Sequence, residues 1–310
     1  MADIKQYVFF DFEMLCSHRG MEMEEMEAIR LGAVKHDLET GQIFYFDRFI
    51  KPLNRKALSA FCKKLTGIKD SDLRSAHSFG QVFEEFLNWI GGVKRTRFFS
   101  WSKSDLSRLK MDAKNHGVPE GMIKKIEKRY VDFQAIFAKR VSKNTPSVEN
   151  ALALYGLDFE GEKHNPVSDS YNTFRIYQCF SEKVLQSDLI MLKQFIFDKD
   201  IQDVKQVGYF LKHNFKKDLD VFVLDLRDMY VMKDAKKMIK QTQRLVEKYE
   251  NIIINRSGIF AEDIIESVRL LVHFFHQLLA SYDEHFMHSS KIMILDEQLM
   301  KQVQHLSKTS

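Results

Sequence analysis

Cysteine is scarce in this chain of 310 residues, which contains only Cys16, Cys62 and Cys179. The number is odd and no two of them form a Cys-x-x-Cys pair, so the sequence supports neither a disulfide framework nor a zinc ribbon. Free thiols are typical of a reducing compartment. We therefore expect a cytoplasmic protein.

Long apolar runs are missing as well. The N-terminal run, Tyr7 to Phe10, is short and leads directly into Asp11, which is not the pattern of a signal peptide. The most apolar later stretch, residues 259–282, is interrupted by charged residues that would be costly in lipid, namely Glu262, Asp263, Glu266 and Arg269. We therefore expect no membrane-spanning segment.

The composition is that of a globular protein, with 45% apolar and 29% charged residues, and the length fits about two domains. Residues 1–180 hold 28 Lys and Arg against 24 Asp and Glu, whereas residues 181–310 hold 19 of each. The basic excess of the first part suits a polyanionic substrate. The balanced charge of the second part argues against a strong general phosphate-binding platform there.

An acidic pair, Asp11 and Glu13, ends the first apolar run. Residues 4–12 read as a strand, and alternate residues of a strand point to the same face, so we expect the two carboxylates side by side. Neighbouring anions raise each other's pKa unless a divalent cation neutralises them. The pair therefore indicates a metal site, with a strand end that carries two solvated acids as the alternative.

Strand and helix patterns then alternate, which predicts an α/β fold. The acidic stretch of residues 21–27 is interpreted as a solvated loop rather than a second metal site. Strands are expected at residues 28–36, 43–50, 97–101 and 130–132. Helices are expected at residues 59–65, 79–90, 106–115 and 133–140, from Ser147 to Gly156, and from Pro166 to about Phe180.

Three further candidate site residues lie at the boundaries of these elements. Asp105 falls between a strand and a helix, while His164 and Asp169 flank a helix start marked by Asn165 as N-cap and Pro166 as first residue. A neutral imidazole beside a carboxylate at such a boundary can act as a general base next to a metal. The alternatives are a helix N-terminal carboxylate at 105, a surface histidine at 164 and a helix-face aspartate at 169.

Together these residues resemble the three motifs of the DEDD-type 3′–5′ exonucleases, in the subgroup with a histidine. The motifs are Asp11-x-Glu13, Asp105 and His164-x4-Asp169. The intervening sequence is similar to the histone-mRNA-3′-exonuclease-like branch in four segments that follow in the same order. These segments are residues 27–34, Lys51-Pro52, residues 58–68 and Ser100-Trp101. The resemblance covers about residues 1–180.

The resemblance implies a ribonuclease H-like fold, with a mixed five-stranded sheet flanked by helices, in an exonuclease domain of residues 1–182. It implies metal-dependent hydrolysis of single-stranded RNA or DNA from the 3′ end, with release of nucleoside 5′-monophosphates. By the resemblance, His164 takes the proton of the attacking water, and the backbone of Phe12 and Met14 with neighbouring side chains binds the 3′-terminal nucleotide.

The same resemblance, together with the residue types, implies two divalent cations. The ligands are Asp11, Glu13 and Asp169, with Asp105 reaching the second ion directly or through water. Oxygen ligands of this kind select Mg²⁺ or Mn²⁺ over zinc. Two such ions clamp the oxygens of a phosphodiester and lower the pKa of a bound water.

The third motif departs from the family pattern H-x-A-x-D-D. Pro166 stands at the alanine and Ser168 at the first aspartate, whereas Asp169, at the position of the metal ligand, is kept. The change concerns packing and hydrogen bonding around the ligand more than ligation. It leaves open a catalytically weak, exonuclease-like regulatory protein that binds nucleic acid or a protein partner. A scaffold whose function lies in the C-terminal region is a third possibility.

Residues 183–310 lie outside the resemblance and are expected to form a mostly helical domain. Residues 234–249 read as a basic amphipathic helix and residues 261–286 as a long one. Residues 219–226 fit a strand or a buried helix turn. The apolar stripe from Ile264 to Tyr282 is suited to packing on the catalytic domain or on a second copy, which makes a homo-oligomer possible.

Overall fold

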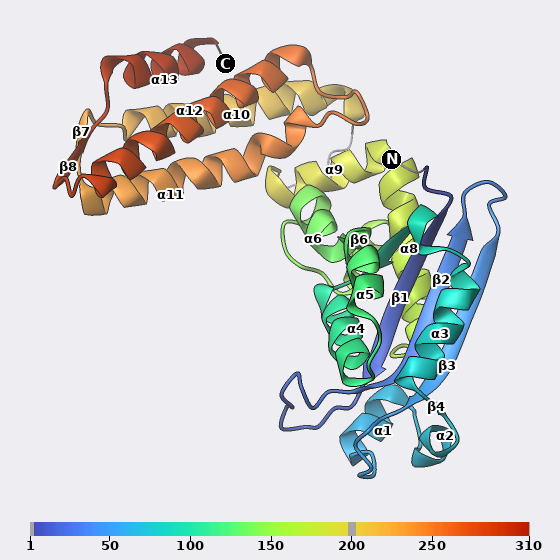
Figure 1. Cartoon of the computed structure of the whole chain (residues 1–310). Coiled ribbons are helices and arrows are strands. Elements are labelled where there is room, and N and C mark those ends of the chain that lie inside the picture. Colours follow the sequence, from blue (N-terminus) through green and yellow to red (C-terminus); the bar gives the residue numbers. More distant parts are fainter. Residues whose placement is uncertain (1–2, 198–202, 310) are drawn as a thin grey trace. The chain divides into compact units, whose positions relative to one another are not determined.

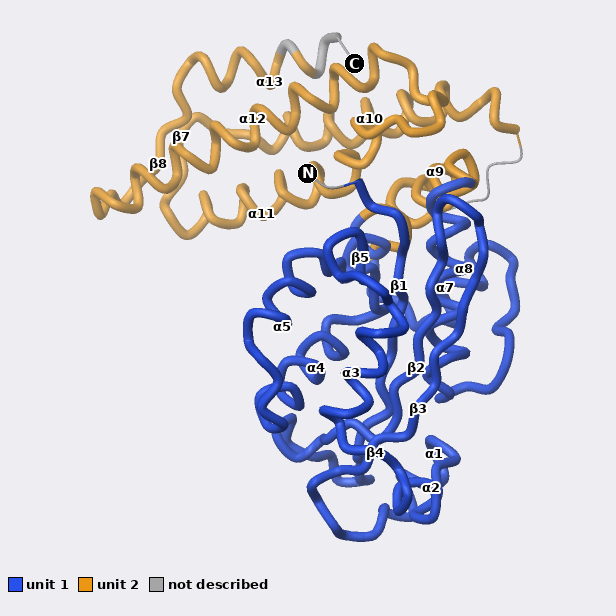
Figure 2. Tube along the Cα trace, turned by 45° about the vertical axis from the view of Figure 1, so that its right-hand side comes forward, with its two compact units in different colours: residues 1–139, 144–182 blue, residues 140–143, 183–310 orange. Residues whose placement is uncertain are grey.

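The computed structural model describes residues 3–197 and 203–309, and the chain divides into two compact units (Figures 1 and 2). Unit 1 comprises Met1–Lys139 and Asn144–Glu182, and unit 2 comprises Arg140–Lys143 and Lys183–Ser310. Four residues from the sequence range of the expected exonuclease domain thus group with the helical unit. Residues 198–202 of the expected helical region lie outside the described residues.

Unit 1 is built on a mixed six-stranded sheet in the order β4-β3-β2-β1-β5-β6. Strands β1, β2 and β3 form an antiparallel meander, and β5 and β6 are parallel to β1. The strands are β1 (Gln6–Met14), β2 (Ala28–Asp37), β3 (Ile43–Lys51), β4 (His77–Ser78), β5 (Thr96–Ser100) and β6 (Tyr130–Asp132). The predicted α/β fold is confirmed. The sheet has six strands where five were expected, because the two-residue β4 adds to the edge of β3.

One face of the sheet carries the larger apolar core. Val8, Phe10 and Phe12 of β1 pack there beneath α3, α4 and α5. Helix α3 has the predicted bounds, because Ser78 and Gln81 form a capping box and Gly91 ends the helix at φ 75°. The helices of this part are α1 (Ala60–Thr66), α2 (Asp70–Arg74), α3 (Phe79–Ile90), the 3₁₀ turn η1 (Val93–Arg95), α4 (Lys103–Asn115) and α5 (Glu120–Glu127).

The opposite face of the sheet is covered by α8, α6 and α7. The ring of Phe9 lies 5.4 Å from those of Phe174 and Tyr177 on α8. The elements are α6 (Phe133–Phe137), the π-helix η2 (Ala138–Ser142), α7 (Val148–Leu154) and α8 (Pro166–Glu182). The expected helix at residues 133–140 is therefore shorter and gives way to a π-helical turn. Asp11 and Glu13 alternate in phase with Phe9, so they face α8.

Unit 2 contains four long helices in a ring of contacts, α10 on α11, α11 on α12, α12 on α13 and α13 on α10. The expected mostly helical structure is confirmed for the described residues, and residues 219–224 end a helix rather than form a strand. A short two-stranded antiparallel sheet, β7 (Met229–Val231) with β8 (Ile292–Ile294), was not anticipated. The helices are α9 (Val184–Phe195), η3 (Val204–Gln206), α10 (Val207–Leu224), α11 (Met232–Tyr249), η4 (Glu250–Ile253), α12 (Glu262–Met287) and α13 (Glu297–Thr309). None of the described helices is long and apolar enough to span a bilayer.

Candidate active site

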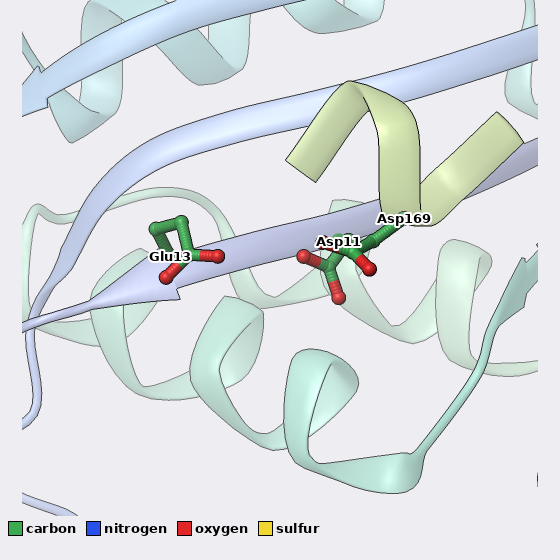
Figure 3. A group of neighbouring side chains, drawn as sticks. All are labelled: Asp11, Glu13 and Asp169. Atoms are coloured by element: carbon green, nitrogen blue, oxygen red, sulfur yellow. The ribbon is translucent and has the colours of Figure 1, made fainter. Parts of the chain in front are cut away.

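Three carboxylates meet where β1 passes beneath the first turn of α8 (Figure 3). One oxygen each from Asp11, Glu13 and Asp169 lies within 4.8 Å of the others. Asp11 and Glu13 come from alternate positions of β1, as the spacing predicts, and Asp169 comes from the first turn of α8. The structure thus brings together residues that are more than 150 positions apart in the chain.

The close approach of α8 to the sheet depends on Gly32 in β2, the residue paired with Asp11. A Cβ atom at this position would lie 2.3 Å from the carbonyl carbon of Pro166 and from the backbone nitrogen of Val167. In addition, the Ser170 hydroxyl donates a hydrogen bond of 3.1 Å to the carbonyl of Gly32. The absent side chain at residue 32 therefore lets the helix start seat directly over Asp11.

Asp105 approaches the cluster from the other side of β1. Pairing between β1 and β5 ends at Phe9 and Phe99, so the backbone N–H of Phe12 has no partner on β5. This N–H donates instead to Oδ1 of Asp105, at 3.2 Å, from the first turn of α4. Asp105 is 3% exposed. The structure thus places the fourth predicted carboxylate next to the backbone that joins Asp11 to Glu13.

His164 lies in the loop immediately before α8, in the left-handed region at φ 59°. Its backbone N–H is directed at the carboxylate of Asp169. Its imidazole is exposed to solvent, and among the described residues the ring makes no hydrogen bond. The role of His164 as a general base therefore remains a prediction, and so does the assignment of the four carboxylates as metal ligands.

The two residues expected at the 3′-terminal nucleotide are oriented differently from the carboxylates. Phe12 is 5% exposed, and its side chain belongs to the core under α3. Met14 is partly buried against the same core. Contacts from these two residues to a nucleotide would thus come from their backbones, and the Phe12 N–H is already bound by Asp105.

The two departures in the third motif are packing residues. Pro166 is the residue that rests on Gly32. The Ser168 side chain lies against Gly161, where a Cβ would come within 2.4 Å of the Ser168 hydroxyl oxygen, and its carbonyl accepts a 2.8 Å hydrogen bond from Asn172. Neither substitution removes a carboxylate from the group of three, consistent with an effect on packing.

Burial raises the pKa of each carboxyl group in the cluster. The pKa of Asp11 lies well above its usual range because of burial, and the charges of Asp105, Asp169 and Glu13 raise it further. Burial raises the pKa of Glu13 to about 8, with Asp169 adding to the effect and Arg30 opposing it. The pKa values of Asp105 and Asp169 rise to about 7, mainly through burial. The cluster therefore retains protons or requires a counter-charge.

The residues present fit divalent cations of the magnesium class. All four donors are carboxylates, which are the hard oxygen ligands that Mg²⁺ and Mn²⁺ prefer. Arg30 faces Glu13 across the β1–β2 pair, but its guanidinium is bound to Asp47 through hydrogen bonds of 2.8 and 2.7 Å. A bound cation would supply the positive charge that the cluster lacks.

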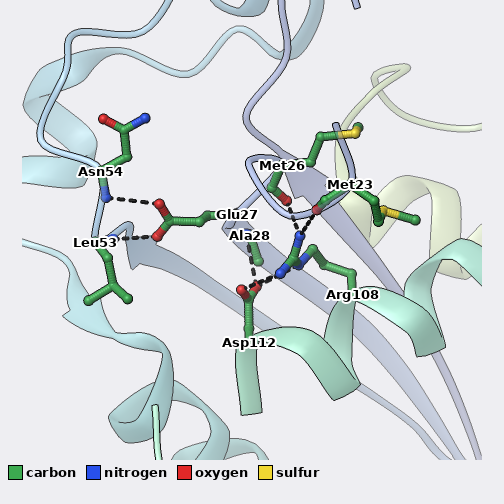
Figure 4. Close-up of polar contacts among 8 residues, drawn as sticks. All are labelled: Met23, Met26, Glu27, Ala28, Leu53, Asn54, Arg108 and Asp112. Atoms are coloured by element: carbon green, nitrogen blue, oxygen red, sulfur yellow. Dashed lines mark hydrogen bonds and ion pairs between the residues drawn. The ribbon is translucent and has the colours of Figure 1, made fainter. Parts of the chain in front are cut away.

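A buried ion pair on α4 supports this end of the sheet (Figure 4). Arg108 is 0% exposed and binds Asp112 through two hydrogen bonds of 2.9 and 2.7 Å. The guanidinium also donates to the carbonyls of Met23 and Met26, each at 2.7 Å. Asp112 accepts a further hydrogen bond of 3.0 Å from the N–H of Ala28. The pair thereby ties the end of the β1–β2 loop and the start of β2 to α4.

The N–H of Ala28 lies at an irregularity of the sheet. The register of β1 and β2 shifts between Glu13, paired with Arg30, and Met14, paired with Ala28. Bulges of this kind redirect neighbouring side chains and are frequent beside active sites. By holding Ala28, Asp112 fixes the backbone next to the candidate ligand Glu13. Sequence reasoning missed the pair, although the Arg-x3-Asp spacing on a helix was a visible signal.

The acidic β1–β2 loop is less uniform than expected. Glu22, Glu24 and Glu25 are exposed, as a solvated loop predicts. Glu27 instead accepts hydrogen bonds from the backbone N–H groups of Leu53 and of Asn54, the latter at 2.9 Å (Figure 4). Glu27 is therefore a structural contact to the segment after β3.

The sequence profile of the RNase T family, described as exonuclease, matches residues 8–177, which is more than half of the chain. The chain belongs to this family. Its predicted resemblance to the DEDD-type exonucleases with a histidine is thereby confirmed. The matched range ends within α8, so unit 2 lies almost entirely outside it.

Curated relatives and solved structures agree with the assignment. ERI1 exoribonuclease 2 of Danio rerio is 26% identical over 197 residues, covering 55% of this chain and 34% of that protein. The 3′-5′ exonuclease Snipper of Drosophila melanogaster is 28% identical over 190 residues, covering 56% of this chain and 68% of that protein. This chain thus spans about a third of the length of the first relative.

The solved structures show the fold. The nuclease domain of 3′hExo, a DEDDh family member bound to rAMP, superposes with a TM-score of 0.52 at 22% identity, covering 58% of this chain and 95% of that domain. Cell-death related nuclease 4 superposes with a TM-score of 0.50 at 23% identity, over 58% of this chain and 64% of that one. The ribonuclease H-like fold expected for unit 1 is confirmed.

Replacement of Gly32 should separate α8 from the sheet. We expect Gly32→Ala to destabilise the protein by about 1–3 kcal/mol or more, because the new methyl group meets backbone atoms that cannot rotate away. Urea unfolding measures the loss. Gly121→Ala is the matched control, since its Cβ meets nothing within 4 Å in α5, and it should be neutral or slightly stabilising. Equal effects of the two substitutions would contradict the role given to Gly32.

The stability of the metal-free protein should fall as the pH rises. The folded-state pKa values of about 7 to 8 exceed the unfolded values of about 4, so the stabilisation from bound protons is complete below pH ~4 and is lost between pH ~4 and ~8. Calorimetry in EDTA at pH 5 to 8 measures the decrease in Tm. Asp11→Asn should flatten this dependence, and Mn²⁺ should raise Tm more at pH 8 than at pH 5. An unchanged slope in Asp11→Asn would place the pH dependence elsewhere.

Loss of one partner of the buried ion pair should be costly. Arg108→Met leaves Asp112 buried without its cation, and we expect a loss of about 3–5 kcal/mol in the free energy of unfolding. The double variant Arg108→Met/Asp112→Leu should recover part of this loss, because no unpaired charge remains buried. Urea unfolding of both variants checks the comparison. If the double variant is as unstable as the single one, the hydrogen bonds to the loop rather than the charges carry the energy.

Proposed function

We propose that this protein is a metal-dependent 3′–5′ exonuclease that releases nucleoside 5′-monophosphates from single-stranded RNA or DNA. The observation that carries the proposal is the group of Asp11, Glu13 and Asp169, with ligand oxygens within 4.8 Å, and with buried Asp105 beside it. Membership of the RNase T exonuclease family supports the reaction class.

We assign the following roles to the chain's own residues. Asp11, Glu13 and Asp169 would hold Mg²⁺ or Mn²⁺, and Asp105 would contribute to a second ion. Bound cations would neutralise the phosphodiester and lower the pKa of the attacking water. Gly32 and the Asp105 bond to Phe12 keep the carboxylates in place.

His164 would accept the proton of the attacking water. Its exposed imidazole lies at the entrance to α8, five residues before Asp169 and outside the carboxylate group. A ring in this position is accessible to water and to the 3′ end of a nucleic-acid strand. Its backbone N–H holds it near Asp169 without occupying either ring nitrogen.

Digestion of end-labelled oligonucleotides tests the proposed reaction. RNA and DNA strands of the same sequence are incubated with the full chain in Mg²⁺, Mn²⁺ or EDTA. We expect a ladder that shortens from the 3′ end, nucleoside 5′-monophosphates as products, and no reaction in EDTA. Asp11→Asn should reduce the rate to that of the EDTA sample because a cation ligand is lost, whereas Glu24→Gln on the exposed loop should not. Activity of Asp11→Asn close to that of the wild type would sink the metal assignment.

Removal of the imidazole should separate its role from that of the carboxylates. We expect His164→Ala to lower the rate by roughly 10²–10⁴-fold, which is the contribution of a general base. The stabilisation by Mn²⁺, measured as the shift in Tm, should be largely retained. A loss of this shift as large as in Asp169→Asn would mean that His164 is a ligand. An unchanged rate would mean that it takes no part.

A further inference from the structure

Residues 183–310 are close to neutral, with 19 Lys and Arg against 18 Asp and Glu, but the charge is not evenly distributed. Residues 207–249, from the start of α10 to the end of α11, hold 10 Lys and Arg against 6 Asp and Glu, whereas the remainder of residues 183–310 holds 9 against 12. Helix α11 alone has six basic residues and two acidic ones. The balanced total, which argues against a strong general phosphate-binding platform, thus conceals a basic excess in this pair of helices.

A groove lies between α10 and α11 in unit 2. Its volume is about 340 Å³. The base of the groove is apolar and includes Phe222, Met238 and Leu245. Basic side chains come from both walls, Lys217 from α10 and Arg244 and Lys248 from α11. The groove is thus an apolar channel with cations on its two sides.

Two of these three cations are available to a ligand. Lys248 binds Asp218, at 2.5 Å, and the Tyr249 hydroxyl also donates to this carboxylate, at 2.6 Å. Lys217 and Arg244 form no ion pair within residues 203–309 of unit 2, and both are exposed. Lys248 therefore neutralises Asp218, whereas Lys217 and Arg244 remain without an acidic partner in this range.

Exposed apolar side chains also lie along α10, beside the groove. Phe210, Val221 and Leu224 are 44%, 58% and 84% exposed, and their spacing of eleven and three residues keeps them on the same side of the helix as Lys217. Apolar and aromatic surfaces interleaved with cations are the pattern that binds single-stranded nucleic acid, because bases stack while phosphates pair with Lys and Arg. A purely apolar partner would leave Lys217 and Arg244 desolvated without a counter-charge.

We propose that the α10–α11 groove binds the single strand of nucleic acid whose 3′ end is degraded in unit 1. The inference rests on the proposed function and gives unit 2 the role of a second contact to the substrate. Phosphates lie against Lys217 and Arg244, whereas Lys248 stays bound to Asp218. Bases lie on the apolar base of the groove and on Phe210, on the same side of α10. Asp225 also lines the groove, at the end where the groove adjoins a second hollow beside the β7–β8 sheet. The strand therefore occupies the end of the groove away from Asp225.

Binding without catalysis tests this contact. The anisotropy of a labelled 30-nucleotide single strand is titrated with the full chain in EDTA, over a range of salt concentrations. We expect Lys217→Glu/Arg244→Glu to lower the affinity about tenfold or more. The slope of log K against log salt should decrease by about 1.4, since each phosphate contact on a single strand contributes about 0.7. Lys217→Ala/Arg244→Ala should lower the slope by a similar amount and the affinity to a smaller extent, because it removes the two cations without adding repulsion. Asp225→Asn should tighten binding.

Two controls separate the groove from a general effect of charge. Lys183→Glu/Lys291→Glu makes the same change of net charge at exposed positions outside the groove and should bind like the wild type. Phe210→Ala removes a stacking surface without changing charge and should lower the affinity about fivefold or more. Equal affinity and salt slope in the wild type and the groove variants would overturn the proposal. Equal weakening in the Lys183→Glu/Lys291→Glu control would do so as well.

Short substrates distinguish failure of this inference from failure of the proposed reaction. In Mn²⁺, hydrolysis of a four-nucleotide strand should be unchanged in the groove variants, because they leave the carboxylates and His164 of unit 1 intact and so short a strand has few phosphates for a second contact. If the wild type neither binds the single strand nor cleaves it, the result counts against the proposed function. Normal cleavage with no contribution from the groove would count against the inference alone. Light scattering tests the alternative occupant, which is a second copy of the chain. A dimer that is lost in Lys217→Glu/Arg244→Glu would assign the groove to that second copy.

Discussion

The contact between Gly32 and the first turn of α8 is the constraint on which the carboxylate cluster depends. Gly32 pairs with Asp11 in the sheet and lies under Pro166 at the helix start. A strand residue without a side chain often marks such a close backbone approach. Because Asp169 follows Pro166 by three residues, the depth at which the helix seats fixes its distance from Asp11. Burial raises the pKa of Asp11 most, and the further rise caused by the charge of Asp169 is a consequence of the same contact.

The cluster is held from two sides by different means. Helix α8 is placed by packing, through Gly32 and the hydrogen bond from Ser170. Helix α4 packs on the core as well, but it is also tied to the strands by charged groups, since Asp105 binds the N–H of Phe12 and Asp112 binds that of Ala28. Both N–H groups lie where the regular pairing of β1 is broken, by the end of β5 pairing or by the shift after Glu13. The irregular parts of the sheet are therefore the parts that carry the site.

The regular elements could be predicted because their signals are local. Helix α3 has an apolar spacing and a terminal glycine, and α8 has Asn165 and Pro166 at its start. Strands β4, β7 and β8 each have three residues or fewer, which is too short for an alternating pattern to be visible in the sequence. Residues 219–226 alternate like a strand, but the burial of Phe215 and Leu219 four positions apart makes this stretch the end of a helix.

The candidate site was predictable to the level of residue types and no further. The resemblance named the carboxylates, but not the burial that sets their pKa values, which depends on the packed sheet. In the sequence, Arg108 and Asp112 have the spacing of an ordinary surface pair on a helix. Only the structure shows that the loop carbonyls of Met23 and Met26 enclose the pair. The charge of each helix in unit 2 could be counted, but which of these helices line the same groove could not be read from the sequence. Such properties arise from contacts between distant segments.

The position of Asp105, Arg108 and Asp112 on one face of α4 has a dynamic consequence. If this helix leaves the sheet, the N–H groups of Phe12 and Ala28 lose their acceptors in the same event. Their exchange with deuterium is then governed by one local opening rather than by two independent ones. Such an opening would remove a candidate cation ligand and release the β1–β2 loop together, so the candidate site would be lost as a unit while the remaining strands stay paired.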